Sequence, residues 1–267
     1  MIRRLPRPEL LPFVSRLWAA DAEPAPGGRE LVVPSGAMHV VIRLDEPLRV
    51  YDRIDDAVPR TVGRAIIGGA RAEPYIRDTS QPVRSVGAQL RPGVAGLLLG
   101  ASGRALAGRH SLLDEVWGRA ADELCEQLAE AEGAAARLDR FEAALLARLP
   151  RVRGVHPAVA HALGRFAIAD DVAVVVDEVG YSHRRFIALF DDAVGLTPKR
   201  YCRVQRLQRA IAAVATSRRP LAEVAAATGY ADQAHLTREF RALVGISPGE
   251  YRARIGTEPN HVPLTSR

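Results

Sequence analysis

The chain has 267 residues, of which 48% are hydrophobic and 25% are charged, a composition that suits two folded domains of modest size. It contains no run of about eighteen apolar residues, and its basic N-terminus lacks the apolar stretch of a secretion signal, so we expect a cytoplasmic protein with no membrane partner. Residues 1–150 carry 20 Lys and Arg against 20 Asp and Glu, whereas residues 151–267 carry 17 against 11, so the whole positive excess lies in the half that we expect to meet a polyanion.

The first half begins with short apolar runs of strand character. Gly and Pro separate these runs, which cover residues 30–33, 39–44, 48–51, 65–67 and 83–90. In the second run Val40, Ile42 and Leu44 alternate with other side chains, as in a strand with one strongly buried face. The pattern predicts a small antiparallel β-barrel or sandwich.

Helical periodicity replaces the strands after residue 93. Apolar residues recur at helical spacing over residues 114–131 and 134–149, which predicts two helices with one apolar face each. These helices either cover the sheet or contribute to a homodimer interface. The two cysteines, Cys125 and Cys202, are too few for a disulfide framework or a four-cysteine zinc site, and we expect both to be reduced.

The second half contains one pattern twice, with the copies about fifty residues apart. Residues 174–203 and 223–252 each have an apolar helical stretch, then Gly-Tyr, a Ser or Asp that can cap the next helix, a Phe, a Val-Gly, a Pro and a Tyr. This is the order of a helix-turn-helix. We predict a β-rich sensing or dimerisation domain with two C-terminal helices over residues 1–150, a double helix-turn-helix domain over 151–256 and a flexible tail over 257–267.

The first copy predicts helices over residues 157–168, 172–179 and 182–194. Ser182 is the expected N-cap of the last helix, and Gly180 permits the positive φ angle of the turn before it. The buried face of this helix is predicted to contain Phe186, Leu189 and Phe190. The residues left facing outward, which could contact DNA bases, are His183, Arg184, Ile187 and Ala188.

The second copy repeats the plan with helices over residues 221–228 and 232–244. Asp232 is the expected N-cap, and the predicted buried face contains Leu236, Phe240 and Leu243. Gln can pair with adenine and Arg with guanine in the major groove, so the exposed group here is suited to reading base edges. That group contains Gln233, Ala234, His235, Thr237 and Arg238.

Between the copies, residues 198–217 read as one long helix. About nineteen residues give a rod near 28 Å, which is close to the roughly 34 Å between successive major grooves on one face of DNA. A rod of this length could hold two helices in neighbouring grooves of double-stranded DNA. The cations expected to contact phosphates are Lys199, Arg200, Arg203, Arg206, Arg218, Arg219 and Arg241.

The two copies, with GYS and VGLTP in the first and GYADQAHLTREF and VGISPGEY in the second, are similar to the DNA-binding domain of the AraC/XylS family of bacterial transcription regulators over residues 157–254. The resemblance implies a seven-helix domain that places two recognition helices in major grooves, and contacts with RNA polymerase. By position, Gln233, Ala234, His235 and Arg238 match base-contacting residues of the family. The matching positions in the first copy are Arg184, Ile187 and Ala188, where Ala188 stands in place of a common Arg.

The N-terminal half resembles the small cupin-like β-barrels that precede this DNA-binding domain in many relatives, and an uncharacterised domain type found in some of them. The resemblance implies a small-molecule effector or dimerisation, although no residue of the sequence identifies the ligand. The expected function is therefore a sequence-specific transcription regulator. The alternatives are an alkylation-repair regulator with a methyl-accepting cysteine and a metal-binding cupin enzyme.

Signals for catalysis and for bound cofactors are weak. His39 lacks the second His two residues later that a cupin metal site uses, because Val41 occupies that position. The glycines of residues 93–103 lack the Gly-Lys-Ser/Thr ending of a phosphate loop, and the chain contains no G-x-S-x-G motif. We predict no catalytic residue, no metal and no cofactor.

Overall fold

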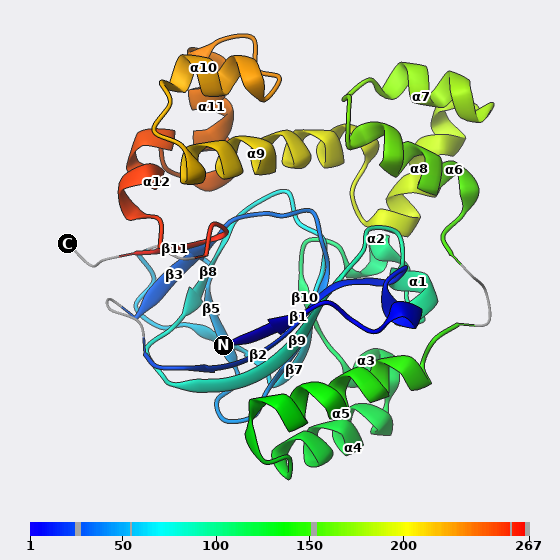
Figure 1. The fold of residues 1–267 in the computed structure, drawn as a ribbon, viewed down its shortest axis with the longest axis vertical. Coiled ribbons are helices and arrows are strands. Elements are labelled where there is room, and N and C mark those ends of the chain that lie inside the picture. The colour runs from blue at the N-terminus through cyan, green and yellow to red at the C-terminus, as the bar shows by residue number, and fades with distance from the viewer. Residues whose placement is uncertain (25–27, 54, 151–153, 257, 265–267) are drawn as a thin grey trace.

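The computed structural model describes residues 1–24, 28–53, 55–150, 154–256 and 258–264. Two antiparallel sheets form the first half, and helices form most of the second (Figure 1). The predicted fold class, α+β with a small antiparallel β domain before an all-α domain, is confirmed. Part of the predicted junction between the domains, residues 151–153, lies outside the described residues.

The larger sheet has six strands in the order β1-β2-β9-β4-β7-β10. Their bounds are Ile2–Arg4, Val14–Ala22, Val83–Leu90, His39–Arg43, Ala65–Gly68 and His110–Leu112. The smaller sheet has five strands in the order β11-β3-β8-β5-β6. Their bounds are His261–Pro263, Arg29–Val32, Tyr75–Asp78, Leu48–Tyr51 and Arg60–Gly63. The two sheets curve around a common interior, as Figure 1 shows.

All five predicted runs are strands, namely β3, β4, β5, β7 and β9. The long strand β2 was not predicted, because its alanines at 19, 20 and 22 have a weak preference for strands. In β4 the predicted alternation holds: Val40 and Ile42 are fully buried in the main core, while His39, Val41 and Arg43 line a cavity inside the sheets. Both faces of this strand are therefore inside the protein.

Helices cover the outer face of the six-stranded sheet. The helices of this half are α1 (Ala95–Leu98), α2 (Gly103–Leu106), α3 (Asp114–Trp117), α4 (Arg119–Ala129) and α5 (Gly133–Ala147). The single helix predicted over 114–131 is interrupted at Gly118, so that α3 and α4 are separate. Helix α5 contacts β2 and β9 and buries Leu138, Phe141 and Leu145 completely. The apolar face of α5 therefore covers the sheet, which is the first of the two alternatives predicted for it.

Seven helices among the described residues form the second half: α6 (Pro157–Phe166), α7 (Val172–Val179), α8 (His183–Val194), α9 (Pro198–Thr216), α10 (Leu221–Ala227), α11 (Gln233–Val244) and α12 (Pro248–Arg254). The predicted caps are present. Ser182 Oγ accepts a hydrogen bond from the Arg185 amide, and Asp232 Oδ1 accepts one from the His235 amide. No helix in the described part of the chain is both long and apolar enough to cross a bilayer.

The end of the chain differs from the predicted flexible tail. Residues His261–Pro263 form β11, which pairs antiparallel with β3 of the first half. The strand is held because Val262 is fully buried in the core of the second helix-turn-helix unit, beside Leu31 of β3. The sequence alone does not predict this strand, because its pairing partner β3 lies more than two hundred residues away in the chain.

The two halves also meet elsewhere, for example at α2 and on α9. Helix α2 contacts α8, and the Arg104 guanidinium donates to the Ala188 carbonyl oxygen over 3.1 Å and pairs with Asp191 at 2.9 Å. On α9, the Gln208 amide donates to the Pro34 carbonyl oxygen over 2.8 Å. The double helix-turn-helix is therefore docked on the β domain along its length.

Candidate nucleic-acid interface

The two helix-turn-helix units lie at opposite ends of α9, as Figure 1 shows. The second helices of the two units, α8 and α11, are the ones predicted to contact bases. Each begins shortly after a glycine in the left-handed conformation, Gly180 with φ +68° and Gly229 with φ +84°, and each has a side-chain N-cap. The helix between them has nineteen residues. At a rise of 1.5 Å per residue it is about 28 Å long, close to the groove spacing of DNA.

Helix α8 presents most of its predicted base-contacting residues to solvent. His183, Arg184 and Ala188 are exposed, and Ile187 is half-buried. The inner face is formed by the fully buried Phe186 and Phe190, as predicted. Arg104 contacts Ala188 and Asp191, in the middle and the C-terminal half of α8. The first turn of α8, which Arg104 does not reach, is therefore the part most accessible to DNA.

Helix α11 presents Gln233, Ala234 and Arg238 to solvent. His235 and Thr237 are half-buried and already have partners. The His235 Nδ1 accepts a hydrogen bond from the Ala231 amide over 3.3 Å, and its ring lies edge-on to Tyr230 with centroids 5.3 Å apart. Because His235 helps to hold the turn in place, Gln233 and Arg238 are the polar side chains of α11 with the most freedom to meet a base.

The cations predicted to contact phosphates fall into two groups. Lys199, Arg218, Arg219 and Arg241 are exposed, and so is Arg200, which pairs with Glu73 at 2.7 Å. Arg203 and Arg206 are half-buried, with partners of their own.

These two half-buried arginines connect helices. The Arg203 guanidinium donates two hydrogen bonds of 2.8 Å to the Glu239 carboxylate on α11, which holds the pKa of Glu239 below its usual value. Arg206 pairs with Asp170 at 2.8 Å and lies over the Tyr230 ring. We therefore assign these two residues a positioning role first, since they fix α9 against α11 and against the start of α7.

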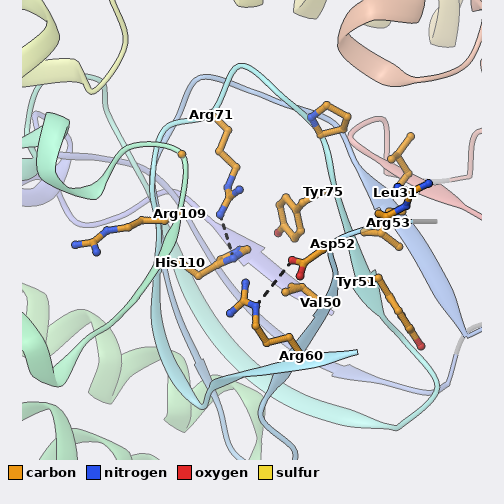
Figure 2. A pocket seen from close by; sticks show the side chains of 13 residues that line it. Leu31, Val50, Tyr51, Asp52, Arg53, Arg60, Arg71, Tyr75, Arg109 and His110 are labelled. Atoms are coloured by element: carbon orange, nitrogen blue, oxygen red, sulfur yellow. Dashed lines mark hydrogen bonds and ion pairs between the residues drawn. The ribbon is translucent and has the colours of Figure 1, made fainter. Parts of the chain in front are cut away.

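The interior of the β domain contains a cavity of about 600 Å³, the lumen cavity. Its walls are residues of both sheets, and its mouth is lined by α9 and by residues 258–261, which supply Gln208, Ile211 and His261. A second hollow of about 550 Å³, the side pocket, shares a wall with it (Figure 2). The shared wall contains Arg71, Tyr75 and His110.

The sequence alone did not single out these lining residues. They come from separate strands and loops, and the strand pattern predicted only one buried face. A signal was present, however, because the polar side chains of His39 and Arg43 occupy alternate positions in a strand whose other face is apolar. A covered second face turns such positions into a polar lumen.

The cysteines have the environment of packing residues. Burial raises the pKa of Cys202 to about 12, and burial also raises the pKa of Cys125. A thiol of raised pKa is a poor nucleophile because the thiolate is the reactive form. Neither cysteine therefore supports the methyl-accepting alternative. Within the described residues, no cluster of three or more His, Cys, Asp or Glu side chains is arranged to hold a metal.

Comparisons with known proteins divide the chain in the same way. Residues 175–254 match a family model described as a helix-turn-helix domain, and residues 2–111 match one described as a domain of unknown function.

The helix-turn-helix part is 37% identical over 68 residues to the probable transcriptional regulator LumQ of Photobacterium leiognathi, and 33% identical over 94 residues to the arabinose operon regulatory protein of Escherichia coli K12. These matches cover 26% and 35% of this chain, and 27% and 32% of the relatives' lengths.

A solved structure, the DNA-binding domain of AdpA in complex with a target DNA, is similar with 31% identity and a TM-score of 0.33, covering 36% of this chain and 86% of that one. Both of these curated relatives are named as regulators. The double helix-turn-helix domain of this chain is therefore a domain of the AraC type.

Proposed function

We propose that this protein is a sequence-specific transcription regulator that inserts α8 and α11 into successive major grooves of one DNA duplex. The observation that carries the proposal is the exposure of Arg184 on α8 and of Gln233 and Arg238 on α11, at the two ends of a rigid helix. The exposed cations around them supply phosphate contacts, which give affinity and salt dependence but not sequence choice. The protein would act in the cytoplasm, where bacterial DNA lies.

We propose further that the β domain modulates DNA binding through a small effector in the lumen cavity. A volume of about 600 Å³ is in the range of small-molecule sites, and residues of α9 form part of its wall. A homodimer and contacts with RNA polymerase are additional proposals, which rest on the family resemblance.

The proposal is tested by equilibrium binding to duplexes recovered from genomic DNA, compared with scrambled duplexes of the same length. Affinity for the recovered duplex should fall steeply as salt rises, yet stay well above affinity for the scrambled one. Equal affinity for the two would refute sequence-specific recognition.

Two arginines of α11 offer a matched pair of variants, since both are exposed. Arg238→Ala should weaken binding to the recovered duplex by about 1 to 3 kcal/mol and relax the preference at one base pair. Arg241→Ala should weaken binding to both duplexes alike and reduce the slope of log affinity against log salt by about 1. The base-reading assignment fails if the two variants behave identically.

A further inference from the structure

The lumen of the β domain is a cavity with polar and aromatic side chains in its walls, whereas the interior of a small barrel is usually filled by side chains. Trp18, His39, Arg43, Tyr75, Arg77 and His110 all line the lumen cavity. A small apolar cluster around Leu48, Val50 and Ile66 fills part of the interior. Trp18 lies flat against β9 because Gly87 has no side chain; a Cβ there would overlap the indole ring. The backbone is thus adapted to keep an aromatic surface at the cavity wall.

Several charges at the cavity already form ion pairs. Glu30 binds Arg77 and also His261, with its carboxylate 3.1 Å from the His261 Nδ1. Asp78 pairs with Arg49 at 3.0 Å. The negative charges of Glu30 and Asp78 are therefore balanced by basic side chains of the protein itself.

Arg71 is different. Its Nη2 donates to the His110 Nδ1 over 3.0 Å, and its guanidinium lies 4.9 Å from the Tyr75 ring centroid. Its Nε is buried without a hydrogen-bond partner, and no carboxylate within the described part of the chain pairs with it. Arg71 is half-buried, and leaving its buried Nε without an acceptor is costly, so an anion would compensate it.

His110 contributes no negative charge, and its tautomer follows from its partner. Burial lowers the pKa of His110 to about 3, with the Arg71 charge as a further cause, so the ring is neutral near pH 7. Arginine can only donate, so Nδ1 accepts and Nε2 carries the proton. The same wall therefore offers two donors to an anion, a guanidinium and an imidazole N–H.

The side pocket strengthens this positive charge. Arg53, Arg60 and Arg109 line it along with Arg71, and Asp52 is the one acidic residue in its lining within the described residues (Figure 2). Asp52 lies 3.9 Å from Arg60 and is therefore partly compensated. The side pocket therefore adds positive charge on its own side of the shared wall, although its Arg53 pairs with Asp55 at 3.1 Å. The lining of the lumen cavity holds as many Asp and Glu residues as Arg residues, so the positive charge there is local to Arg71.

We propose that the lumen cavity binds a small organic carboxylate, with its carboxylate at Arg71 and His110 and its apolar body toward Trp18, Val41 and Ile66. The planar guanidinium matches a carboxylate in geometry and charge, and the aromatic and aliphatic walls suit an aryl or alkyl body. This inference rests on the proposed effector function, for which it supplies the chemical class of the ligand.

The test uses the full chain with Trp117→Phe, so that Trp18 is the single tryptophan and reports on the cavity by its fluorescence. The probe is 4-phenylbutyrate, and its uncharged amide of the same shape is the comparison ligand. The carboxylate should bind at least about tenfold more tightly than the amide, because only the charged ligand compensates Arg71.

Two variants then locate the anion. Arg71→Gln should reduce the preference for the carboxylate to about threefold or less, while Arg119→Gln should leave it unchanged. Arg119 is the matched control, since it is exposed, carries the same charge and lines neither the side pocket nor the lumen cavity. If Arg71→Gln does not fold, His110→Gln serves in its place, with the same expected reduction.

Equal affinities for carboxylate and amide would overturn the proposal, and so would an unchanged preference in Arg71→Gln. Saturation by inorganic phosphate with no saturable binding by a panel of alkyl and aryl carboxylates would overturn the carboxylate assignment. Sequence-specific DNA binding is measured on the same preparations. A chain that binds specific DNA but no carboxylate refutes only this inference, whereas one that binds the carboxylate but no specific DNA refutes the regulator.

Discussion

The contact between α2 and α8 can be tested with a single added methyl group. Gly103 lies at the start of α2, and an added Cβ would lie 2.5 Å from the Ala193 carbonyl oxygen and 2.8 Å from the Gly195 amide nitrogen. Ordinary contacts of a Cβ begin at about 3.4 Å, and the opposing atoms are backbone, which cannot rotate away. Gly103→Ala must therefore separate α2 from the end of α8.

We expect Gly103→Ala to lower the free energy of unfolding by about 1 to 3 kcal/mol, the usual cost of overpacking a tight contact. The matched control is Gly96→Ala in α1, where the nearest atom is the Ala101 carbonyl oxygen at 4.0 Å. An alanine in a helix with free space around it should be neutral or stabilising by about 0.5 to 1 kcal/mol.

Urea unfolding followed by circular dichroism measures both effects, and amide hydrogen exchange shows where they act. Exchange should become faster in α2 and in the C-terminal half of α8 in Gly103→Ala, and in neither of them in Gly96→Ala. The docking described above is refuted if Gly103→Ala is as stable as the parent, or if its faster exchange falls in α4 and α5 instead.

Three further changes test other parts of the structure. Val262→Ala should lower the free energy of unfolding by about 2 kcal/mol, because Val262 is fully buried although it belongs to the predicted tail; no loss in urea unfolding would mean that β11 is not formed. Glu239→Gln should lower the free energy of unfolding by about 1 kcal/mol or less, because the Arg203 side chain that it pairs with is 41% exposed. A double-mutant cycle with Arg203→Gln that gave no coupling energy would contradict the pairing. The pKa of His39 is lowered to about 4, chiefly by burial, so the unfolded chain takes up a proton that the folded chain does not. The contribution of His39 to stability should therefore be fully present above about pH 7.5 and fall by about 2 kcal/mol between about pH 7 and pH 5. His110 adds to the same fall, because its pKa is also lowered, to about 3. His39→Gln should reduce the slope, and an identical slope in the variant would show that His39 titrates normally.

Much of the double helix-turn-helix could be predicted because its determinants are local. Ser182 and Asp232 cap helices that begin one residue later, and Phe186 and Phe240 lie on faces fixed by helical spacing. The strands from β3 to β9 were predicted in part for the same reason, since alternation is visible in a few residues.

The remaining features depend on contacts between distant segments. The pairing of β11 with β3 joins residues 261–263 to residues 30–32, and no local pattern in three residues specifies it. Arg203 and Arg206 were assigned to phosphates because their charge is visible in the sequence, whereas Glu239 and Asp170 become their partners only after folding. The Arg71 wall is likewise assembled from a loop and two strands.

The position of α9 gives the proposed regulation a physical route. Gln208 and Ile211 on this helix line the lumen cavity, while Arg203, about 7.5 Å along the helix axis from Gln208, holds Glu239 of α11 through two hydrogen bonds. A ligand that moves the mouth of the cavity must therefore act on the same rod that sets the spacing and orientation of the two reading helices. Since α9 is one continuous helix, it transmits such a displacement as a rigid body instead of absorbing it, and a shift that changes the groove register of either α8 or α11 changes DNA affinity.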